Sequence, residues 1–216
     1  MRKLLVFGAL VAAAASAPAF AQDVTVSANV TLTSDYAWRN TTQSNYDPVV
    51  QGGFDVDFGN GFYAGTWASG VDFNDSSDVN LEIDFYGGYT FDLGGVGADI
   101  GAIYYAYPDS SSDINFWEVY GALSKDFDNG LSLGGSLNWD PDNETVYADA
   151  SVGYAVTDIF SISAGYGKWI EGLGEYEGWN AGATLSLHGL DFGLTYYDND
   201  ITGNDDSFVF SIGKAL

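Results

Sequence analysis

The stretch VTVSANVTLT at residues 24–33 alternates apolar side chains with hydroxyl and amide side chains at successive positions. This alternation is typical of a β-strand with one apolar and one polar face. The pattern recurs along the chain, for example as VNLEIDFY at residues 79–86 and VGADIGAIY at residues 96–104. We therefore predict an all-β fold.

Twelve segments follow this pattern, and most match the roughly 9–11 residues of a membrane-spanning strand. Tight turns such as FGNGF at residues 58–62 alternate with longer polar connections such as residues 35–47. An even number of strands with this layout is typical of a transmembrane antiparallel up-and-down β-barrel. The predicted strands are 24–34, 48–58, 62–73, 79–91, 96–107, 114–127, 131–139, 145–156, 159–169, 177–187, 190–198 and 206–216.

The positions of the basic residues favour a membrane barrel over a soluble sandwich or a soluble ligand-carrying barrel. Lys125, Lys168 and Lys214 fall on the apolar face, but only at strand ends. A lysine that faces lipid costs roughly 2–4 kcal/mol at the midplane and about 0–1 kcal/mol near the interface, so strand ends are where a lipid-facing surface tolerates it.

Aromatic side chains form two groups at opposite ends of the predicted strands, as two membrane interfaces require. Those near the short turns are Phe58, Phe62, Phe91, Phe127 and Phe160, and those near the long connections are Trp38, Phe73, Tyr104, Trp117, Trp139, Trp169 and Trp179. The last predicted strand, residues 206–216, is expected to pair with the first, because a spanning sheet must leave no open edge.

Residues 1–21 resemble a secretory signal peptide, with Arg2 and Lys3 at the start, an apolar run at residues 4–15 and the small-x-small site AFA at residues 19–21. The apolar run is too short for a spanning helix. We expect an outer-membrane barrel domain at residues 22–216, exported to the cell outer membrane of a Gram-negative bacterium.

The composition excludes several classes of protein. With 30 acidic and 6 basic residues, the formal net charge is −24, which argues against nucleic acid as a partner. A content of 16% aromatic and 46% hydrophobic residues argues against disorder. The absence of cysteine excludes disulfides and thiolate metal sites. We expect no cofactor.

Several motifs resemble the TorF family of porin-like outer-membrane barrels. The matching residues are SANVTLTSDY (27–36), Arg39, QS (43–44), DPVVQGGFD (47–55), GFYAGTWAS (61–69), EIDFYGGY (82–89), YYAYP (104–108) and EVY (118–120). Where the family pattern has Arg-Gly-x-Ser-Gln-Ser, residues 39–44 depart at two positions. The resemblance implies an outer-membrane barrel of channel type and assigns no catalytic or substrate-binding residue.

Little in the sequence indicates an enzyme or a metal site. The one histidine, His188, lies in a short turn, away from the long connections where a catalytic base would be expected. The acidic segments at residues 74–78 and 204–206 lack the EF-hand spacing, so solvated loops are the favoured interpretation and calcium binding is the alternative. We predict that the protein is not an enzyme.

Two functions remain open. A twelve-stranded barrel lies between filled eight-stranded barrels and open porins. An unpaired buried charge costs several kcal/mol, so water should reach much of the polar face. We favour a narrow, cation-leaning channel for small hydrophilic solutes or cations. The alternative is a surface adhesin or binding barrel with a plugged lumen. The oligomeric state is left open, and lipid is the expected surrounding.

The predicted selectivity element lies on the polar face. Carboxylates on strands that run in the same direction should gather near one level, where tyrosines narrow the passage and Arg39 at the loop edge neutralises or gates the carboxylates. The candidate lumen residues are Glu82, Asp84, Asp99, Glu118, Asp149, Arg39, Tyr86, Tyr105 and Tyr120.

We predict that processing removes residues 1–21 and leaves Gln22 at the amino terminus, because signal peptidase requires the small side chains at residues 19 and 21. N-terminal analysis of membrane-extracted protein checks this. A first residue more than two positions from Gln22 would contradict it.

Overall fold

The computed structural model describes residues 24–74, 78–111, 114–172, 176–201 and 205–216. The predicted signal peptide at residues 1–21 and parts of the acidic segments at 74–78 and 204–206 lie outside the described residues. No helix long and apolar enough to cross a membrane occurs in the described ranges.

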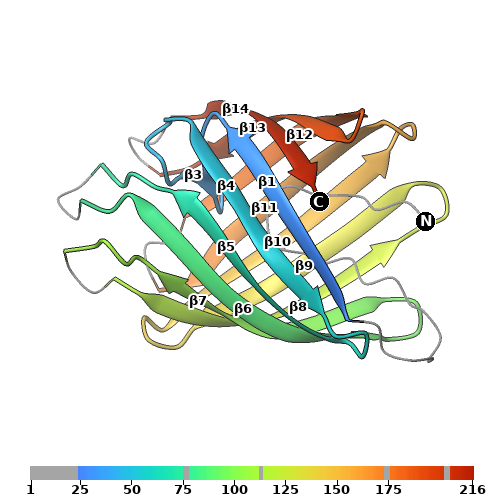
Figure 1. Cartoon of the computed structure of the whole chain (residues 1–216), viewed down its shortest axis with the longest axis horizontal. Helices are drawn as coiled ribbons and strands as arrows, with labels where there is room; N and C mark the ends of the chain where they lie inside the picture. Colours follow the sequence, from blue (N-terminus) through green and yellow to red (C-terminus); the bar gives the residue numbers. More distant parts are fainter. Residues whose placement is uncertain (1–23, 75–77, 112–113, 173–175, 202–204) are drawn as a thin grey trace.

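The described chain forms a closed antiparallel barrel of twelve strands, seen from the side in Figure 1. All twelve predicted strands are confirmed, with each boundary within three residues of its predicted position. The barrel strands are β1 (Thr25–Thr33), β4 (Val49–Asp57), β5 (Phe62–Gly70), β6 (Leu81–Asp92), β7 (Gly97–Ala106), β8 (Phe116–Asp126), β9 (Leu131–Asp140), β10 (Thr145–Ala155), β11 (Phe160–Glu171), β12 (Glu177–Leu187), β13 (Leu190–Asn199) and β14 (Ser207–Ala215). Two further strands, β2 (Ala37–Trp38) and β3 (Thr41–Thr42), form a separate hairpin that the sequence did not predict.

The barrel closes between its first and last strands. β1 pairs along its whole length with β4, and its second half pairs with β14 from Asn29↔Ala215 to Thr33↔Ser211. Beyond this ladder, Leu216 donates its backbone N–H to the Ala28 carbonyl at 2.8 Å and accepts the Ala28 N–H at 3.2 Å. The predicted pairing of the last strand with the first is therefore confirmed, and every barrel strand has two neighbours.

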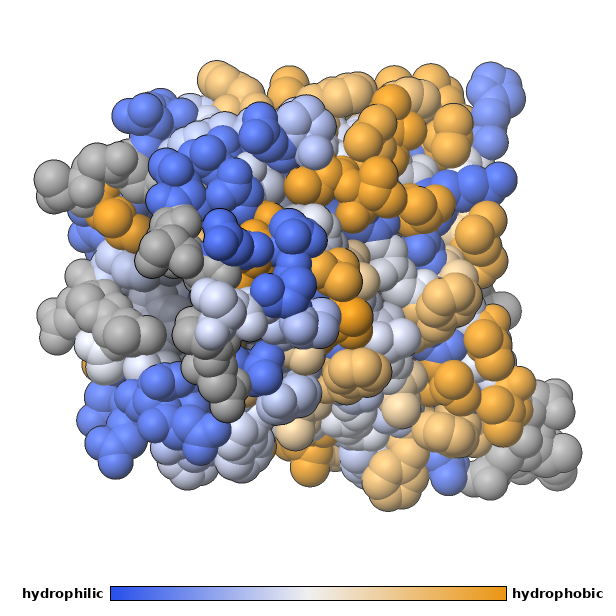
Figure 2. Space-filling model, turned by 60° about the vertical axis from the view of Figure 1, so that its left-hand side comes forward, coloured by the Kyte–Doolittle hydropathy of each residue, from blue (hydrophilic) through white to orange (hydrophobic). Residues whose placement is uncertain are grey.

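The outer wall is an apolar belt. Side chains such as Val26 (67% exposed), Phe54 (62%) and Phe208 (70%) point away from the barrel, and most of their surface is uncovered. Figure 2 shows apolar side chains over the wall and hydrophilic side chains gathered toward the long-loop end, which comes forward on the left. A continuous apolar surface of this kind matches the hydrocarbon of a bilayer.

Three of the predicted belt aromatics belong to the interior instead. Trp169 is only 6% exposed, while Trp38 and Phe73 pack against the buried cluster inside the barrel. Trp38 and Phe73 lie in connections, where strand alternation does not determine direction. Trp169 lies on the same inward face of β11 as Ser163 and Gly167, and only its position at the strand end suggested the belt. Other predicted belt residues, including Trp139 at 49% and Trp179 at 44%, are exposed on the outer wall.

We predict that deletion of residues 210–216 prevents assembly, because β1 would then present unpaired N–H and C=O groups to lipid. The measurement is heat-modifiable gel mobility of the membrane fraction, which reports a closed barrel that resists detergent until boiled. Normal amounts of the heat-modifiable form in the truncated chain would show that β14 does not seal the sheet.

Candidate functional site

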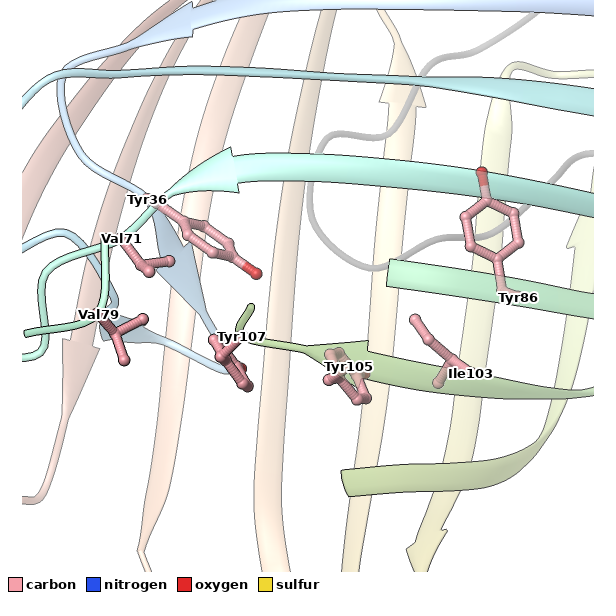
Figure 3. Close-up of a cluster of buried hydrophobic side chains, with 7 residues drawn as sticks. All are labelled: Tyr36, Val71, Val79, Tyr86, Ile103, Tyr105 and Tyr107. Atoms are coloured by element: carbon pink, nitrogen blue, oxygen red, sulfur yellow. The ribbon is translucent and has the colours of Figure 1, made fainter. Parts of the chain in front are cut away.

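Residues 34–48, which we call the plug loop, connect β1 to β4 and fold into the barrel. Figure 1 shows the β2–β3 hairpin within the outline of the barrel, and in Figure 3 Tyr36 projects from this segment toward Tyr107. The hairpin turns at Arg39 and Asn40, whose φ angles of 51° and 65° are left-handed. A two-residue hairpin turn requires such angles at both positions, and asparagine adopts them more readily than most residues.

Hydrogen bonds hold the base of the plug loop together. Asp35 Oδ1 accepts bonds from Ser44 Oγ at 2.8 Å and from Thr42 Oγ1 at 2.6 Å. The backbone N–H of Tyr36 donates to Ser44 Oγ at 2.9 Å. Ser44 is 1% exposed and Asp35 4%, so these bonds are shielded from water and define the shape of the loop.

The tip of the plug loop is attached to the wall formed by β12 and β13. Asn180 donates from Nδ2 to Asn40 Oδ1 at 2.7 Å, and Asn199 donates from Nδ2 to the Asn40 carbonyl at 2.8 Å. Because other bonds of the loop reach β6 and β8, it spans the interior of the barrel.

Arg39 lies at the centre of this arrangement. Its Nη2 is 2.7 Å from Glu118 Oε2, and the two side chains are 7% and 1% exposed. The guanidinium carbon lies 4.1 Å from the ring centroid of Trp38, 4.5 Å from that of Tyr147 and 4.6 Å from that of Trp169. We call these three rings together with Glu118 the Arg39 cage. The predicted position of Arg39 at the loop edge is therefore wrong, because the loop carries it inside.

Three of the predicted lumen carboxylates lie under the plug loop. Glu82 accepts bonds from Tyr36 at 2.8 Å and Tyr107 at 2.6 Å. Glu118 also accepts a bond from Tyr105 at 3.2 Å. Glu82, Asp84 and Glu118 are each at most 3% exposed. The expectation that water reaches them is wrong, since the sequence did not show that a loop covers them.

The remaining predicted lumen residues form separate groups. Asp99, six positions before Tyr105 on β7, accepts the Tyr63 hydroxyl at 2.9 Å, and Tyr63 in turn bonds to Tyr120. Tyr86 on β6 donates to Asp55 on β4. On β10, Asp149 accepts a bond from Ser136. The structure thus gathers Glu82, Asp84, Glu118, Tyr105 and Arg39 at one place, with Asp149 near Arg39 on β10. Asp99, Tyr86 and Tyr120 line the wall elsewhere.

Two of the predicted constricting tyrosines lie along the wall. A Cβ on Gly65 would be 2.4 Å from the ring of Tyr86, and a Cβ on Gly101 would be 2.5 Å from the hydroxyl of Tyr120. Each glycine therefore leaves room for the ring on the neighbouring strand to lie close to the backbone. These tyrosines narrow the lumen less than side chains that point straight inward.

The wall from β9 to β14 has a different character. Most of its inward positions hold glycine, serine or threonine, whereas β4 to β8 hold tyrosines and carboxylates. Half-buried examples on the small-residue wall are Ser136, Ser151, Ser163, Thr184, Thr195 and Ser211. Space for solute is therefore expected beside this wall.

Sequence reasoning missed the residues that hold the plug loop in place. They are Tyr36, Asn40, Tyr147 and Trp169, together with the interior position of Trp38. The available signal was Arg39 itself, the single base of a long polar connection, in a chain with a large excess of acids. Its partners come from β8, β10 and β11, and no sequence spacing relates them to it.

Catalytic and metal-binding chemistry have little support in this arrangement. His188 lies in the tight turn between β12 and β13 with a φ of 54°. In the part of the chain that the structure describes, no group of three or more acidic or histidine side chains is arranged to hold a metal ion. That the protein is not an enzyme stays a prediction.

The closed barrel, its apolar belt and its polar lumen define a protein with the fold of outer-membrane porins. Residues 15–211 match the family described as bacterial protein of unknown function (Gcw_chp), and the chain belongs to this family. The porin character that the TorF resemblance implies agrees with the fold, but the TorF name itself is not confirmed.

Solved porin structures share the architecture. The chain is similar to the KdgM porin, with a TM-score of 0.64 at 10% identity over 88% of this chain and 98% of that chain. For a KdgM porin in complex with disordered oligogalacturonate, the TM-score is 0.63 at 10% identity, over 88% of this chain and 98% of that chain. For the NanC porin, the TM-score is 0.58 at 12% identity, over 88% of this chain and 98% of that chain. At these identities the likeness shows a common fold, and no curated protein matches this chain significantly in sequence.

We predict that Arg39→Met releases the plug loop, because it leaves Glu118 without its cation. Removing one partner of a buried pair costs about 3–5 kcal/mol, so amide exchange at residues 37–42 should rise roughly a hundredfold or more. Hydrogen exchange with mass spectrometry measures this.

The matched control is Lys168→Met, which removes the partner of Glu177 in a pair whose side chains are 42% and 45% exposed. It should leave exchange at residues 37–42 unchanged, because a solvated pair contributes little. Equal protection of the hairpin in Arg39→Met and the unmodified protein would show that the cage does not hold the loop.

Proposed function

We propose that this protein is a narrow channel of the bacterial outer membrane, exported through a cleaved signal peptide, that passes small hydrophilic solutes and prefers cations. The porin fold and the apolar belt support the location. The observation that carries the proposal is the charge of the lumen. Four carboxylates face one base there: Glu118 pairs with Arg39, Asp149 lies near it, and Asp84 lies close to both Glu118 and Glu82.

The negative charge of the lumen limits which solutes can pass. The KdgM porin has been solved with oligogalacturonate, which is a polyanion. Within the described residues of this chain, Arg39 is the only arginine or lysine placed inside the barrel, and Glu118 already pairs with it. Carboxylates without counter-charges attract cations and repel anions. The proposed solutes are therefore neutral or cationic.

The proposed route follows the small-residue wall from β9 to β14. The carboxylates beneath the plug loop lie on the side formed by β6 to β8, and the loop crosses from there to β12 and β13 at the long-loop end. A solute on this route would therefore have to displace the loop at that end. Asp149 faces the lumen from β10 and is half-buried, so it would meet a solute on this route. Asp99, Tyr63 and Tyr120 would line its continuation toward the short turns.

The plug loop also favours a second candidate function. If it stays in place, the barrel would conduct little and could serve as a surface adhesin or binding module through its long loops. Planar-bilayer recording separates these functions, because a plugged barrel gives no steady conductance and a channel does.

We predict that the combined change Glu82→Gln, Asp84→Asn and Glu118→Gln lowers the cation preference, because it removes three negative charges from the lumen. Reversal potentials in a salt gradient across a planar bilayer measure this. The matched control changes Asp57, Asp92 and Asp128, exposed at the short-turn end, to asparagine and removes the same charge.

The control should leave the selectivity nearly unchanged, since exposed charges at the rim are screened by salt. Equal cation and anion permeability in the unmodified protein would reject the proposed selectivity. If the cation preference fell more in the rim control than in the lumen variant, the selectivity element would lie at the rim.

A further inference from the structure

The Arg39 cage has the chemistry of a binding site for an organic cation. Ring faces attract a guanidinium or an alkylammonium group through their quadrupoles, and the attraction is strongest where water is excluded. Tyr147 and Trp169 belong to the barrel wall, and Glu118 adds a carboxylate from β8. Only Trp38 travels with the loop. The wall would therefore keep two rings and a carboxylate if Arg39 left.

The fit between Arg39 and its surroundings is incomplete. Arg39 Nη1 and Glu118 Oε1 are both buried without a hydrogen-bond partner, and so is Asp84 Oδ1 beside them. Buried polar atoms usually find a partner, and leaving one unpaired costs about 1–3 kcal/mol. Arg39, the one cation of this site, therefore leaves oxygens of Glu118 and Asp84 without a partner.

The backbone at Arg39 also points to a function beyond packing. Its φ of 51° is left-handed, a conformation that costs energy for a residue with a long side chain. Such positions persist where the surrounding contacts hold them in place, and they cluster at binding and switching sites. Here the strain places a guanidinium at the tip of a hairpin that reaches into the lumen.

We propose that the Arg39 cage binds a small organic cation of the guanidinium or alkylammonium class, and that Arg39 occupies it as an internal substitute when no such solute is present. A soluble cation would compete with Arg39 for the rings and Glu118, and the hairpin would move away from the wall. This inference deepens the proposed function and rests on it only in requiring that solutes reach the lumen.

The test uses the full-length chain folded in detergent, with methylguanidinium as the probe and sodium chloride at equal ionic strength as the reference. Arg39→Ala empties the cage and should bind the probe saturably, roughly tenfold or more tighter than the unmodified protein. Ligand-observed NMR of the methyl signal measures binding and needs no conduction.

Two double variants localise the site. Arg39→Ala with Trp169→Leu should lose the binding, because it removes a ring of the wall. Arg39→Ala with Trp139→Leu removes a ring that is 49% exposed on the outer wall and should keep it. Equal binding by the two double variants would overturn the proposal.

A second measurement applies to the unmodified protein and remains available if the alanine variant does not fold. Arg39 is the only arginine after Arg2, so its modification by phenylglyoxal is read directly by mass spectrometry. Tetramethylammonium should accelerate this modification relative to sodium, because it displaces the guanidinium from the cage. An unchanged modification rate would overturn the proposal.

Bilayer recordings on the same samples distinguish this inference from the proposed function. Saturable binding without conductance would support the cation site and count against the channel. Conductance with cation preference but no saturable binding would support the channel and overturn the cation site.

Discussion

Closure of the backbone hydrogen-bond ladder is the constraint on which the rest of this structure depends. Hydrocarbon offers no partner to an N–H or C=O group, so a sheet in a bilayer must have no edge. Here β1 meets this requirement by pairing with β4 on one side and β14 on the other, and the last backbone bonds are made by Leu216. Once the sheet is closed, strand alternation divides every strand into lipid-facing and lumen-facing positions.

The interior presents a second problem, because acidic side chains inside a barrel need water or partners. Toward the short turns, Asp55 and Asp99 are paired with tyrosine hydroxyls from the next strand but one in the sheet. At the long-loop end, the plug loop brings Tyr36 to Glu82 and Arg39 to Glu118. The loop therefore both stabilises buried carboxylates and restricts the passage, which joins the stability of this region to its proposed function.

The sequence predicted the barrel well and the site in part. Alternation such as that of VTVSANVTLT at residues 24–33 located all twelve barrel strands. It also correctly placed Glu82, Asp84 and Glu118 on the inward-facing side of their strands. The aromatic belt was predicted wrongly for Trp38 and Phe73, which lie in connections, and for Trp169, which lies on the inward face of β11. Alternation predicts a direction only within a regular strand, so it gives none for Trp38 and Phe73. For Trp169 the alternation of β11 does point inward, and the position at a strand end was the weaker guide.

By itself the sequence determined the strand positions, the two faces of the wall and the acidic character of the lumen, because each follows from side-chain alternation within one short segment. Only the tertiary structure decided that residues 34–48 fold inward and that Arg39 meets Glu118, Tyr147 and Trp169. Those contacts join a loop to strands far along the chain. Their energies depend on which groups the closed barrel brings together and shields from water, and no local pattern encodes that.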